Sequence, residues 1–398
     1  MSTQLDSTGA WELPHEYRML QETIRRFMRE EVKPVEDKLP HDAYTPEPED
    51  LAELQRKARN AGLWLFETPA EHGGAGLNLL GQCIAAEEAA KCRMGIYIAG
   101  TGAFGFDPPV VIWKGTHDQQ RFAREDVERG TKAFVAISEP SGGSDPGRAI
   151  QTRAVLKGDR YVINGTKVWI SGAGMAKWGI VFARVGDSKG REGITSFIVD
   201  KSRPGISLSP IPVIRSYFPY EVHFNDYEVP VEDRLGEEGK GFSFAEDWLI
   251  HARPPYAAAS IGVAQAALEL AKDWARERKV FGSTLAEKQA IQWMIADSEV
   301  ELRAARLLVY QAAWSADLGR DIKVEASMSK VYGTEVAGRV VDRCIQILGG
   351  MGVAREMPLE RWYREMRIRR IGEGPSEVHR MVIARDALNV GRPRSAAA

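Results

Sequence analysis

The spacing of apolar residues changes twice along this chain of 398 residues, and that change most constrains its fold. Up to about residue 130, and again from about 241 to 390, apolar residues recur at the i, i+3, i+4 spacing of amphipathic helices. Between about 131 and 240 they alternate or form short runs rich in β-branched and aromatic residues, as in strands. The sequence therefore predicts an α+β chain of three domains: N-terminal all-helical (1–130), middle β (131–240) and C-terminal helical (241–390).

The middle region predicts an antiparallel sheet or small β-barrel. Two turn signals, Lys157-Gly158-Asp159 and Asn164-Gly165, predict hairpins. Strands that follow one another without helices between them argue against a Rossmann unit, and so against a nicotinamide-dependent dehydrogenase as the first interpretation. The expected strands are Phe134–Ile137, Arg160–Ile163, Lys167–Ile170, Ile180–Val185, Thr195–Val199 and Tyr220–Phe224.

The C-terminal region predicts a four-helix bundle, because long amphipathic helices fit 286–318 and 323–348. Another helix should start near Phe242 and break at Pro254-Pro255, since a proline removes a backbone hydrogen bond inside a helix. The tail 391–398 is expected to be disordered. Helices are also expected in the first region over 14–38, 48–61, 85–90 and 107–130.

Composition excludes several classes of protein. The net charge of −2 carries no basic excess of the kind that binds nucleic acid or anionic membranes. No apolar run is long enough to span a bilayer, and residues 1–14 lack the features of a signal or transit peptide. The cysteines form no CxxC pair and the histidines show no metal-ligand spacing, so we expect reduced thiols and no metal site. These features are typical of a cytoplasmic globular protein.

One carboxylate, Glu373, lies between Gly372 and Gly374 and is followed by Pro375. Each glycine costs about 1 kcal/mol relative to alanine inside a helix, while proline is tolerated only in a first helical turn. The stretch therefore predicts a tight bend between two helices, with the second starting at 376–377. At such a bend a carboxylate can approach a substrate and backbone N–H groups can bind an oxyanion. Taken alone, the pattern also fits a surface turn with an ordinary exposed acid.

Two segments of the middle region carry possible cofactor-binding groups. The Gly-, Ser- and Pro-containing loop 137–145 (ISEPSGGSD) leaves backbone N–H groups free to bind phosphate or the polar edge of a flavin. The stretch 168–171 (VWIS) ends a strand with a large aromatic residue and a hydroxyl. A polar surface turn and a tryptophan in the core are the alternatives for these two segments.

Taken in order, SEPSGGSD, WIS, RKVFG, QILGGMG and IGEGPSEVHR resemble the acyl-CoA dehydrogenase family over roughly residues 14–390. The last motif looks most like the subgroup with Gly-Pro after the acid. The resemblance implies an N-terminal helical domain, a central β domain, a C-terminal four-helix bundle and FAD as cofactor. It also implies a homodimer or homotetramer, because FAD would be gripped by two subunits.

The resemblance implies roles for individual residues, with Glu373 as the catalytic base. The flavin ring would be held by Ile137, Ser138, Gly143, Ser144, Trp169 and Ser171. The FAD pyrophosphate would be bound from a neighbouring subunit by Arg278, Phe281, Gln289, Gln346 and Gly350. Further FAD contacts would come from Pro375 and Glu377, and substrate contacts from Ser144, Arg253 and Gly374.

The sequence departs from the family pattern at a few positions. Pro375 replaces the usual threonine and Val280 a polar residue, and both changes remove hydrogen bonds toward FAD. Ile250 stands where many members have an aspartate that contacts CoA. Ala252 occupies the position of the catalytic glutamate in two branches of the family, so Glu373 has no competing candidate for the catalytic base.

The reaction implied is the FAD-dependent α,β-dehydrogenation of an acyl-CoA to the trans-2-enoyl-CoA. Glu373 would abstract the α-proton, flavin N5 would accept the β-hydride, and an electron-transfer flavoprotein would be the electron acceptor. An acyl-CoA oxidase, a nitroalkane-oxidase-like enzyme or a flavin monooxygenase on the same fold is the alternative, and a helical scaffold without flavin is a more distant one. The acyl group stays open, although small residues in 94–109 would leave room for a bulky or long chain.

Overall fold

The computed structural model of the protein describes residues 12–390 except 42, 44, 189 and 216. The predicted disordered tail, 391–398, lies outside the described residues. The chain forms two compact units. We call the first, Met1–Leu63, Leu77–Ala103 and Ile250–Ala398, the helical unit, and the second, Trp64–Gly76 and Phe104–Leu249, the sheet unit. The three domains expected from the sequence, with boundaries at residues 130 and 240, stay a prediction.

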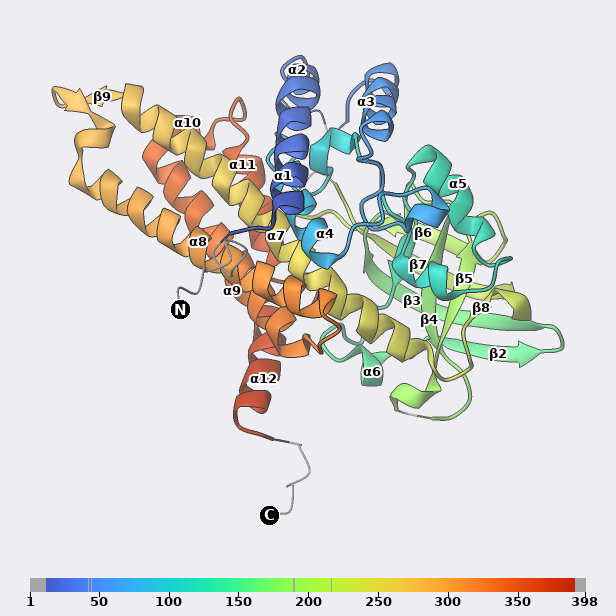
Figure 1. Ribbon diagram of the computed structural model, residues 1–398. Coiled ribbons are helices and arrows are strands. Elements are labelled where there is room, and N and C mark those ends of the chain that lie inside the picture. The colour runs from blue at the N-terminus through green and yellow to red at the C-terminus, as the bar shows by residue number, and fades with distance from the viewer. Residues whose placement is uncertain (1–11, 42, 44, 189, 216, 391–398) are drawn as a thin grey trace, which may run out of the picture. The chain divides into compact units, whose positions relative to one another are not determined.

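The helical unit is built from long helices with short connecting segments (Figure 1). The helix α7 (Gly241–Glu277) starts in the sheet unit and continues in the helical unit from Ile250 onward. The other elements of the helical unit are α1 (His15–Phe27), η1 (Met28–Val32), α2 (Lys33–Glu36), α3 (Pro48–Asn60), α4 (Leu79–Ala89), η3 (Ala99–Gly102), β9 (Lys279–Val280), β10 (Ser283–Thr284), η7 (Leu285–Glu287), α8 (Gln289–Asp317), α9 (Lys323–Leu348), α10 (Gly350–Val353), α11 (Leu359–Arg369) and α12 (Ser376–Ala387).

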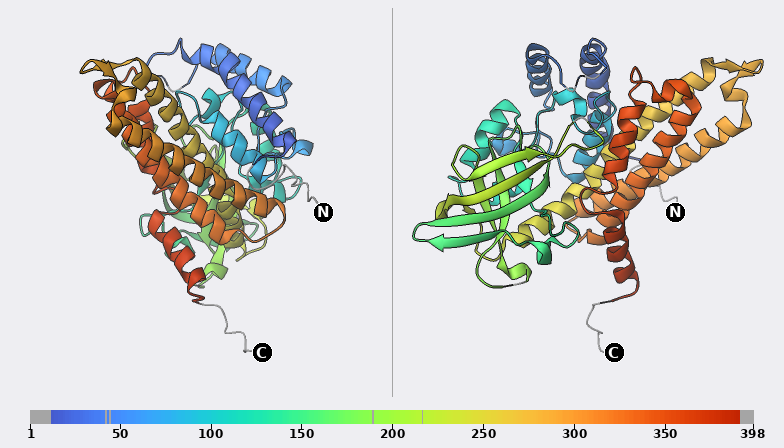
Figure 2. Two further views of the ribbon diagram at one scale, coloured as in Figure 1. Left: turned by 60° about the vertical axis from the view of Figure 1, so that its left-hand side comes forward. Right: turned by 180° about the vertical axis from the view of Figure 1, so that it is seen from behind.

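The core of this unit lies where α4, α7, α8, α9 and α11 meet. Small residues on α7, among them Ala257, Ala264 and Ala271, are fully buried and let the neighbouring helices approach closely. Branched residues on α9, among them Val336 and Val340, belong to the same core. The long helices run side by side in both views of Figure 2, which confirms the expected C-terminal helical bundle.

The predicted break at Pro254-Pro255 is wrong, because α7 passes through both prolines without interruption. Each internal proline removes a backbone hydrogen bond and costs about 3 kcal/mol. Tertiary packing offsets this cost, since Ala257, Ala258 and Ile261 just beyond the prolines are completely buried in the core. Local propensity therefore gives way to burial at this position.

The sheet unit contains a mixed sheet of eight strands in the order β6-β7-β3-β2-β4-β5-β8, with β1 paired to β4 (Figure 1). Its elements are η2 (Ala70–His72), η4 (Val110–Lys114), α5 (Arg121–Arg129), β1 (Phe134–Ala136), α6 (Pro146–Ala149), β2 (Arg153–Lys157), β3 (Arg160–Ile170), β4 (Trp178–Arg184), η5 (Arg191–Gly193), β5 (Ile194–Asp200), β6 (Ile206–Pro210), β7 (Tyr220–Pro230), η6 (Val231–Asp233) and β8 (Arg234–Leu235).

The expectation of an antiparallel sheet or small barrel needs correction in its strand pairing. β1 and β2 each pair with β4 in parallel, and the remaining pairs of the sheet are antiparallel. The connection 137–152 between β1 and β2 is long enough to bring the chain back in the same direction, which a hairpin cannot do. The sequence shows that this connection is long but not where its strands pair.

One of the two predicted hairpins is confirmed and the other is wrong. Lys157 pairs with Arg160 across a two-residue turn in which Gly158 has a φ of +64°. Asn164-Gly165, in contrast, lies inside β3 at an irregularity in its pairing with β7. The Asn164 side chain bonds to Asp226 of β7 there, and Gly165 lies so close to Thr152 that a Cβ would be 2.4 Å from the threonine hydroxyl oxygen.

The helix expected over 107–130 is also wrong, since this segment forms the short η4 and then α5. Residues 115–120 leave the helical path because the Gln119 amide group is held by tertiary contacts. It accepts a hydrogen bond from the Thr116 N–H and donates to the carbonyls of Glu232 and Arg234.

No helix in the described part of the chain combines the length and the apolar character that a bilayer span requires.

Candidate active site

Glu373 lies at the tip of the bend between α11 and α12, as the sequence predicts. Glu373 has a φ of +57° and Gly374 a φ of +91°, and α12 starts directly after Pro375. A Cβ on Gly372 would lie 2.7 Å from the Tyr256 hydroxyl, and one on Gly374 would lie 2.9 Å from His379 Nε2. A side chain at either position would therefore meet a neighbouring side chain, and the left-handed φ of Gly374 also favours glycine there.

Two buried side chains hold the consecutive carbonyl groups of this bend. Lys330 Nζ on α9 donates to the Gly374 carbonyl at 2.6 Å and to the Arg370 carbonyl at 3.2 Å. His379 Nε2, in the first turn of α12, lies 3.0 Å from the Glu373 carbonyl oxygen, and Nδ1 lies 3.2 Å from the Ser327 hydroxyl. Because a carbonyl oxygen only accepts hydrogen bonds, the ring proton belongs on Nε2.

The Glu373 carboxylate is in a desolvated environment. Its Oε2 is buried and has no hydrogen-bond partner among the described residues. Burial raises the pKa of Glu373, while the positive charges of Arg253, Arg369 and Lys330 act to lower it. A carboxylate with a raised pKa can take up a proton at a pH at which a solvent-exposed glutamate stays ionised.

The basic side chains around the bend are also held in place. The Arg369 guanidinium stacks 3.3 Å from the centre of the Tyr256 ring, a cation–π contact between α11 and α7. Burial lowers the pKa of Lys330 to about 8 and the pKa of His379 to about 4, so the histidine is neutral at physiological pH. Arg253 lies close enough to Glu373 to act on its pKa, as does Lys330.

In the sheet unit, a buried ion pair braces the loop 137–145 from inside. The Glu139 carboxylate accepts hydrogen bonds from the backbone N–H groups of Gln151 at 2.6 Å and Thr152 at 3.0 Å, and from Lys167 Nζ at 2.8 Å. Lys167 Nζ also donates to the Ile137 carbonyl at 3.1 Å. Burial lowers the pKa of Lys167 to about 8. The pKa of Glu139 is lowered as well, since the attraction of Lys167 and the hydrogen bonds outweigh the opposing effect of burial.

Trp169 points outward at the end of β3. The pairing of β3 with β7 shifts between Lys167 and Ile170, and Trp169 within this irregularity has a φ of +63°. Lys167 and Val168 are both buried, whereas Trp169 is 59% exposed and Ser171 is exposed. The alternative of a tryptophan packed in the core of this unit is therefore wrong.

The outer part of the same loop is exposed at Gly143 and Ser144, and Ile137 and Ser138 are half-buried. The Ser138 carbonyl accepts the Val168 N–H at 2.9 Å, which ties the loop to the strand of Trp169. In the described part of the chain, the N–H groups of Gly143 and Ser144 donate to no backbone carbonyl. Of the residues predicted to hold the flavin ring, Gly143, Ser144, Trp169 and Ser171 are thus exposed, and Ile137 and Ser138 are half-buried.

A third group of predicted residues gathers at one end of the α8–α9 pair (Figure 1). Phe281 forms the turn of the β9–β10 hairpin with a φ of +49° and is 98% exposed. Because α8 starts and α9 ends at this end of the bundle, the exposed Arg278, Gln289, Gln346 and Gly350 lie at the same end. Pro375 precedes the first turn of α12, and Glu377 is exposed on it.

The residues that hold the Glu373 bend and the loop 137–145 in place were not predicted from the sequence. His379 had a local signal, because a first-turn side chain of α12 can reach back toward the preceding bend. Lys330 had none, since a lysine in an amphipathic helix is normally solvent-exposed. Glu139 lies within the predicted loop, but its ion pair depends on a residue 28 positions away.

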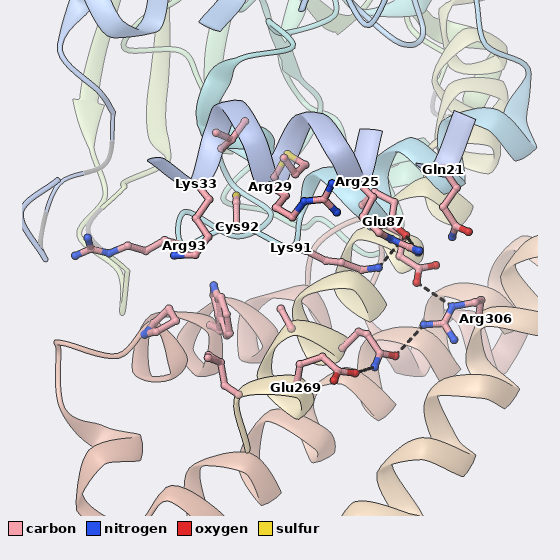
Figure 3. Close-up of a pocket in the computed structure, with 18 of the residues that line it drawn as sticks. Gln21, Arg25, Arg29, Lys33, Glu87, Lys91, Cys92, Arg93, Glu269 and Arg306 are labelled. Atoms are coloured by element: carbon pink, nitrogen blue, oxygen red, sulfur yellow. Dashed lines mark hydrogen bonds and ion pairs between the residues drawn. The ribbon is translucent and has the colours of Figure 1, made fainter. Parts of the chain in front are cut away.

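The helical unit also contains a cavity of about 2040 Å³ (Figure 3). Residues of α1, α4, α7 and α8 line it, and none of 369–379 does. Its inner wall carries satisfied ion pairs: Arg306 Nε donates to Glu87 at 2.8 Å and Arg25 pairs with Glu88 at 2.9 Å. We therefore do not assign this cavity to the candidate active site at Glu373.

Comparison with known proteins places the chain in a family. The sequence matches the acyl-CoA dehydrogenase N-terminal domain over residues 14–125, the middle domain over 134–227 and the C-terminal domain over 239–388. These matches cover most of the chain, which therefore belongs to the acyl-CoA dehydrogenase family, a family of FAD-dependent oxidoreductases that act on acyl-CoA.

Individual relatives agree with this assignment. The short-chain-specific acyl-CoA dehydrogenase of Clostridium acetobutylicum is 34% identical over 94% of this chain and 98% of its own length. The structure of butyryl-CoA dehydrogenase from Megasphaera elsdenii is 31% identical with a TM-score of 0.83, covering 95% of this chain and 99% of the other. A chain in a structure concerning the electron transferring flavoprotein of Acidaminococcus fermentans is 32% identical with a TM-score of 0.83, covering 95% and 99%.

The residues present fit FAD, the cofactor of the family. The sheet unit offers an exposed tryptophan and a loop, braced by the ion pair of Glu139 and Lys167, on which the N–H groups of Gly143 and Ser144 donate to no backbone carbonyl of the described residues. The helical unit offers a fully exposed phenylalanine and an arginine at the β9–β10 hairpin. An aromatic side chain with no covering contact in its own chain is suited to a cofactor or a second subunit.

Proposed function

We propose that this enzyme oxidises an acyl-CoA thioester between its α and β carbons to the trans-2-enoyl-CoA, with Glu373 removing the α-proton. The observation that carries this proposal is the buried Glu373 Oε2, which has no hydrogen-bond partner among the described residues. Burial raises the pKa of this group, and a base with a raised pKa removes a weakly acidic α-proton more effectively. The β-hydrogen would leave with its electron pair to FAD, which supplies the redox chemistry.

The bend also offers a donor for the thioester oxygen. In the part of the chain that the structure describes, the Glu373 N–H donates to no backbone carbonyl. A backbone N–H adjacent to the base can bind the oxygen on which negative charge develops as the α-proton leaves. The same short segment would then supply both the base and part of the oxyanion site.

Anaerobic titration with a panel of acyl-CoAs tests this function. The wild-type protein with FAD should lose its oxidised flavin absorbance with at least one acyl chain, and Glu373→Gln should keep the flavin but lose this bleaching. Because the substitution keeps size and shape and removes only the basic oxygen, retained bleaching by Glu373→Gln would refute the role of Glu373. A flavin that no thioester bleaches would instead favour a nitroalkane-oxidase-like or monooxygenase reaction.

The acyl group and the electron acceptor follow from the relatives only as proposals. The similarity to short-chain enzymes supports a short acyl chain, and the panel should include butyryl-CoA and bulkier thioesters to test it. The similarity to a chain in a structure on an electron transferring flavoprotein supports such a protein as the acceptor. Rapid reoxidation of the reduced flavin by oxygen would favour an acyl-CoA oxidase.

We propose that the protein works as a homodimer or homotetramer. Arg278, Phe281 and Gln346 lie at the far end of α9 from Lys330, which contacts the Glu373 bend. Lys330 and Gln346 are 16 positions apart, about 24 Å along the helix. This spacing supports the hypothesis that the hairpin end serves the cofactor of a neighbouring subunit. A cytoplasmic location stays a prediction from the sequence.

A further inference from the structure

We propose that Lys330 and His379 are positioning residues that set the direction of the Glu373 carboxylate by holding two consecutive carbonyl groups of its bend. The inference rests on the proposed role of Glu373 as the base. Neither residue would touch the substrate, and both would act through the backbone that carries the base.

Hydrogen bonds from His379 and Lys330 restrict the backbone dihedral angles of the Glu373–Gly374 bend. His379 Nε2 holds the carbonyl of Glu373 at 3.0 Å, and Lys330 Nζ holds the carbonyl of Gly374 at 2.6 Å. Together they fix the ψ angle of Glu373 and both angles of Gly374. A glycine can otherwise adopt either sign of φ, so the peptide unit between the two residues could flip once its carbonyl was released.

Glu373 has a reason to move if these contacts are lost. Its φ of +57° is the left-handed conformation, which is unfavourable for a residue with a Cβ. Relaxation to a negative φ would swing the Cα–Cβ bond and move the carboxylate away from its present position. The two carbonyl contacts oppose this relaxation.

The anchoring side chains are themselves rigid. Lys330, His379 and Ser327 are completely buried, and Ser327 and Lys330 lie one turn apart on α9. The Ser327 hydroxyl contacts His379 Nδ1, which fixes the ring orientation. Buried groups with several contacts lose little further freedom when they hold a neighbour, and this makes them effective supports.

Another contact between α9 and the same region provides a matched control. Glu335, about one turn further along α9, forms an ion pair with Arg380 of α12 at 2.7 Å. Arg380 Nη1 and Nη2 both bond to the Glu335 carboxylate, and the arginine side chain is 53% exposed. Arg380→Leu therefore removes a contact between α9 and α12 without releasing either carbonyl.

The experiment compares His379→Leu, His379→Gln and Arg380→Leu with the wild-type protein, each loaded with FAD. Stopped-flow bleaching at saturating acyl-CoA gives the limiting rate, and the dependence of the rate on acyl-CoA concentration gives the thioester affinity.

We expect His379→Leu to lower the limiting rate by about 10- to 100-fold, because a misplacement of the base by about 1 Å costs that much. Affinity should change by less than about threefold, since the substrate contacts stay. The amide donor of His379→Gln should restore the rate to within about threefold of wild type, and Arg380→Leu should match wild type.

Hydrogen–deuterium exchange provides a readout independent of activity. The peptide spanning 370–378 should exchange faster in His379→Leu than in Arg380→Leu. A His379→Leu protein with wild-type bleaching rate and wild-type exchange would overturn the inference while leaving the function of Glu373 intact. If no thioester bleaches the wild-type flavin, the proposed function fails and this inference fails with it.

Lys330→Arg covers the case in which His379→Leu does not fold. Arginine keeps the positive charge but places its donors differently, so the Gly374 carbonyl would lose its present partner. A bleaching rate equal to wild type in Lys330→Arg would overturn the role of Lys330. A rate lowered at least tenfold with unchanged affinity and flavin content would support it.

Discussion

Glu373 combines two features that are unfavourable for folding: a left-handed backbone conformation and a buried carboxylate oxygen without a partner among the described residues. Residues in such conformations persist only where their surroundings hold them, and they concentrate at functional sites. Here the surroundings are Lys330 and His379, which bond the backbone, and Arg253 and Arg369, which lower the cost of the negative charge.

The raised pKa of Glu373 gives a prediction for the pH dependence of bleaching. A base must be unprotonated to accept a proton, so the limiting rate should rise with pH through a midpoint above the ordinary value of 4.5. Arg369→Gln removes one of the charges that lower this pKa, so the midpoint should move to higher pH. Stopped-flow rates from pH 5 to 9 measure both midpoints.

Arg367→Gln is the control for this prediction, because Arg367 is an exposed residue of the same helix that does not act on the pKa of Glu373. Its midpoint should equal that of the wild-type protein. A midpoint that Arg369→Gln leaves unchanged or lowers would contradict the electrostatic account of the bend.

At the scale of elements, the ion pair between Glu139 and Lys167 links the loop 137–145 to the strand β3. Lys167 is completely buried and Glu139 nearly so. Replacing one partner of such a pair leaves an uncompensated charge in a poorly solvated place. Ser138 and Trp169, which we propose contact the flavin, lie one position from Glu139 and two positions from Lys167.

Lys167→Met should therefore destabilise the protein by about 3–5 kcal/mol, measured by urea unfolding at pH 7. Without Lys167 the pKa of Glu139 should rise above 4.5, so the folded form should bind more protons than the unfolded form above that pH. The loss should then be smaller at pH 5 than at pH 7. The double variant Glu139→Gln/Lys167→Met should recover part of the stability. A loss in Lys167→Met that is independent of pH would contradict this explanation.

At the scale of the whole molecule, the exposed apolar residues of the helical unit support the proposed homo-oligomer. Trp293 is 61% exposed and Val300 is 69% exposed on α8, two turns apart on one side of the helix. Phe281, in the hairpin before α8, and Val353, in α10, are further exposed apolar residues of this unit. Large exposed apolar surfaces on soluble proteins are commonly interfaces.

Trp293→Glu should disrupt the assembly, because it introduces a charge into a surface that would be buried between subunits. Sedimentation should show at least a dimer for the wild-type protein and a smaller species for the variant. Leu156→Glu is the control, since Leu156 is a comparably exposed apolar residue on the β2–β3 hairpin and should leave the assembly intact. A wild-type monomer would rule out the proposed homo-oligomer.

The sequence by itself determined the class of fold, the bend at Glu373 and the long helices α8 and α9, because periodicity, glycine and proline act locally. It did not determine the continuity of α7 through Pro254 and Pro255, the parallel pairing of β1 and β2 with β4, or the path of β3 through Asn164-Gly165. Tertiary packing and pairing decided these features. The supports of the candidate site, Lys330 and His379 for the bend and Lys167 for the loop, also appear only in the structure. Their roles depend on contacts between elements, and a local pattern of residues carries no record of those contacts.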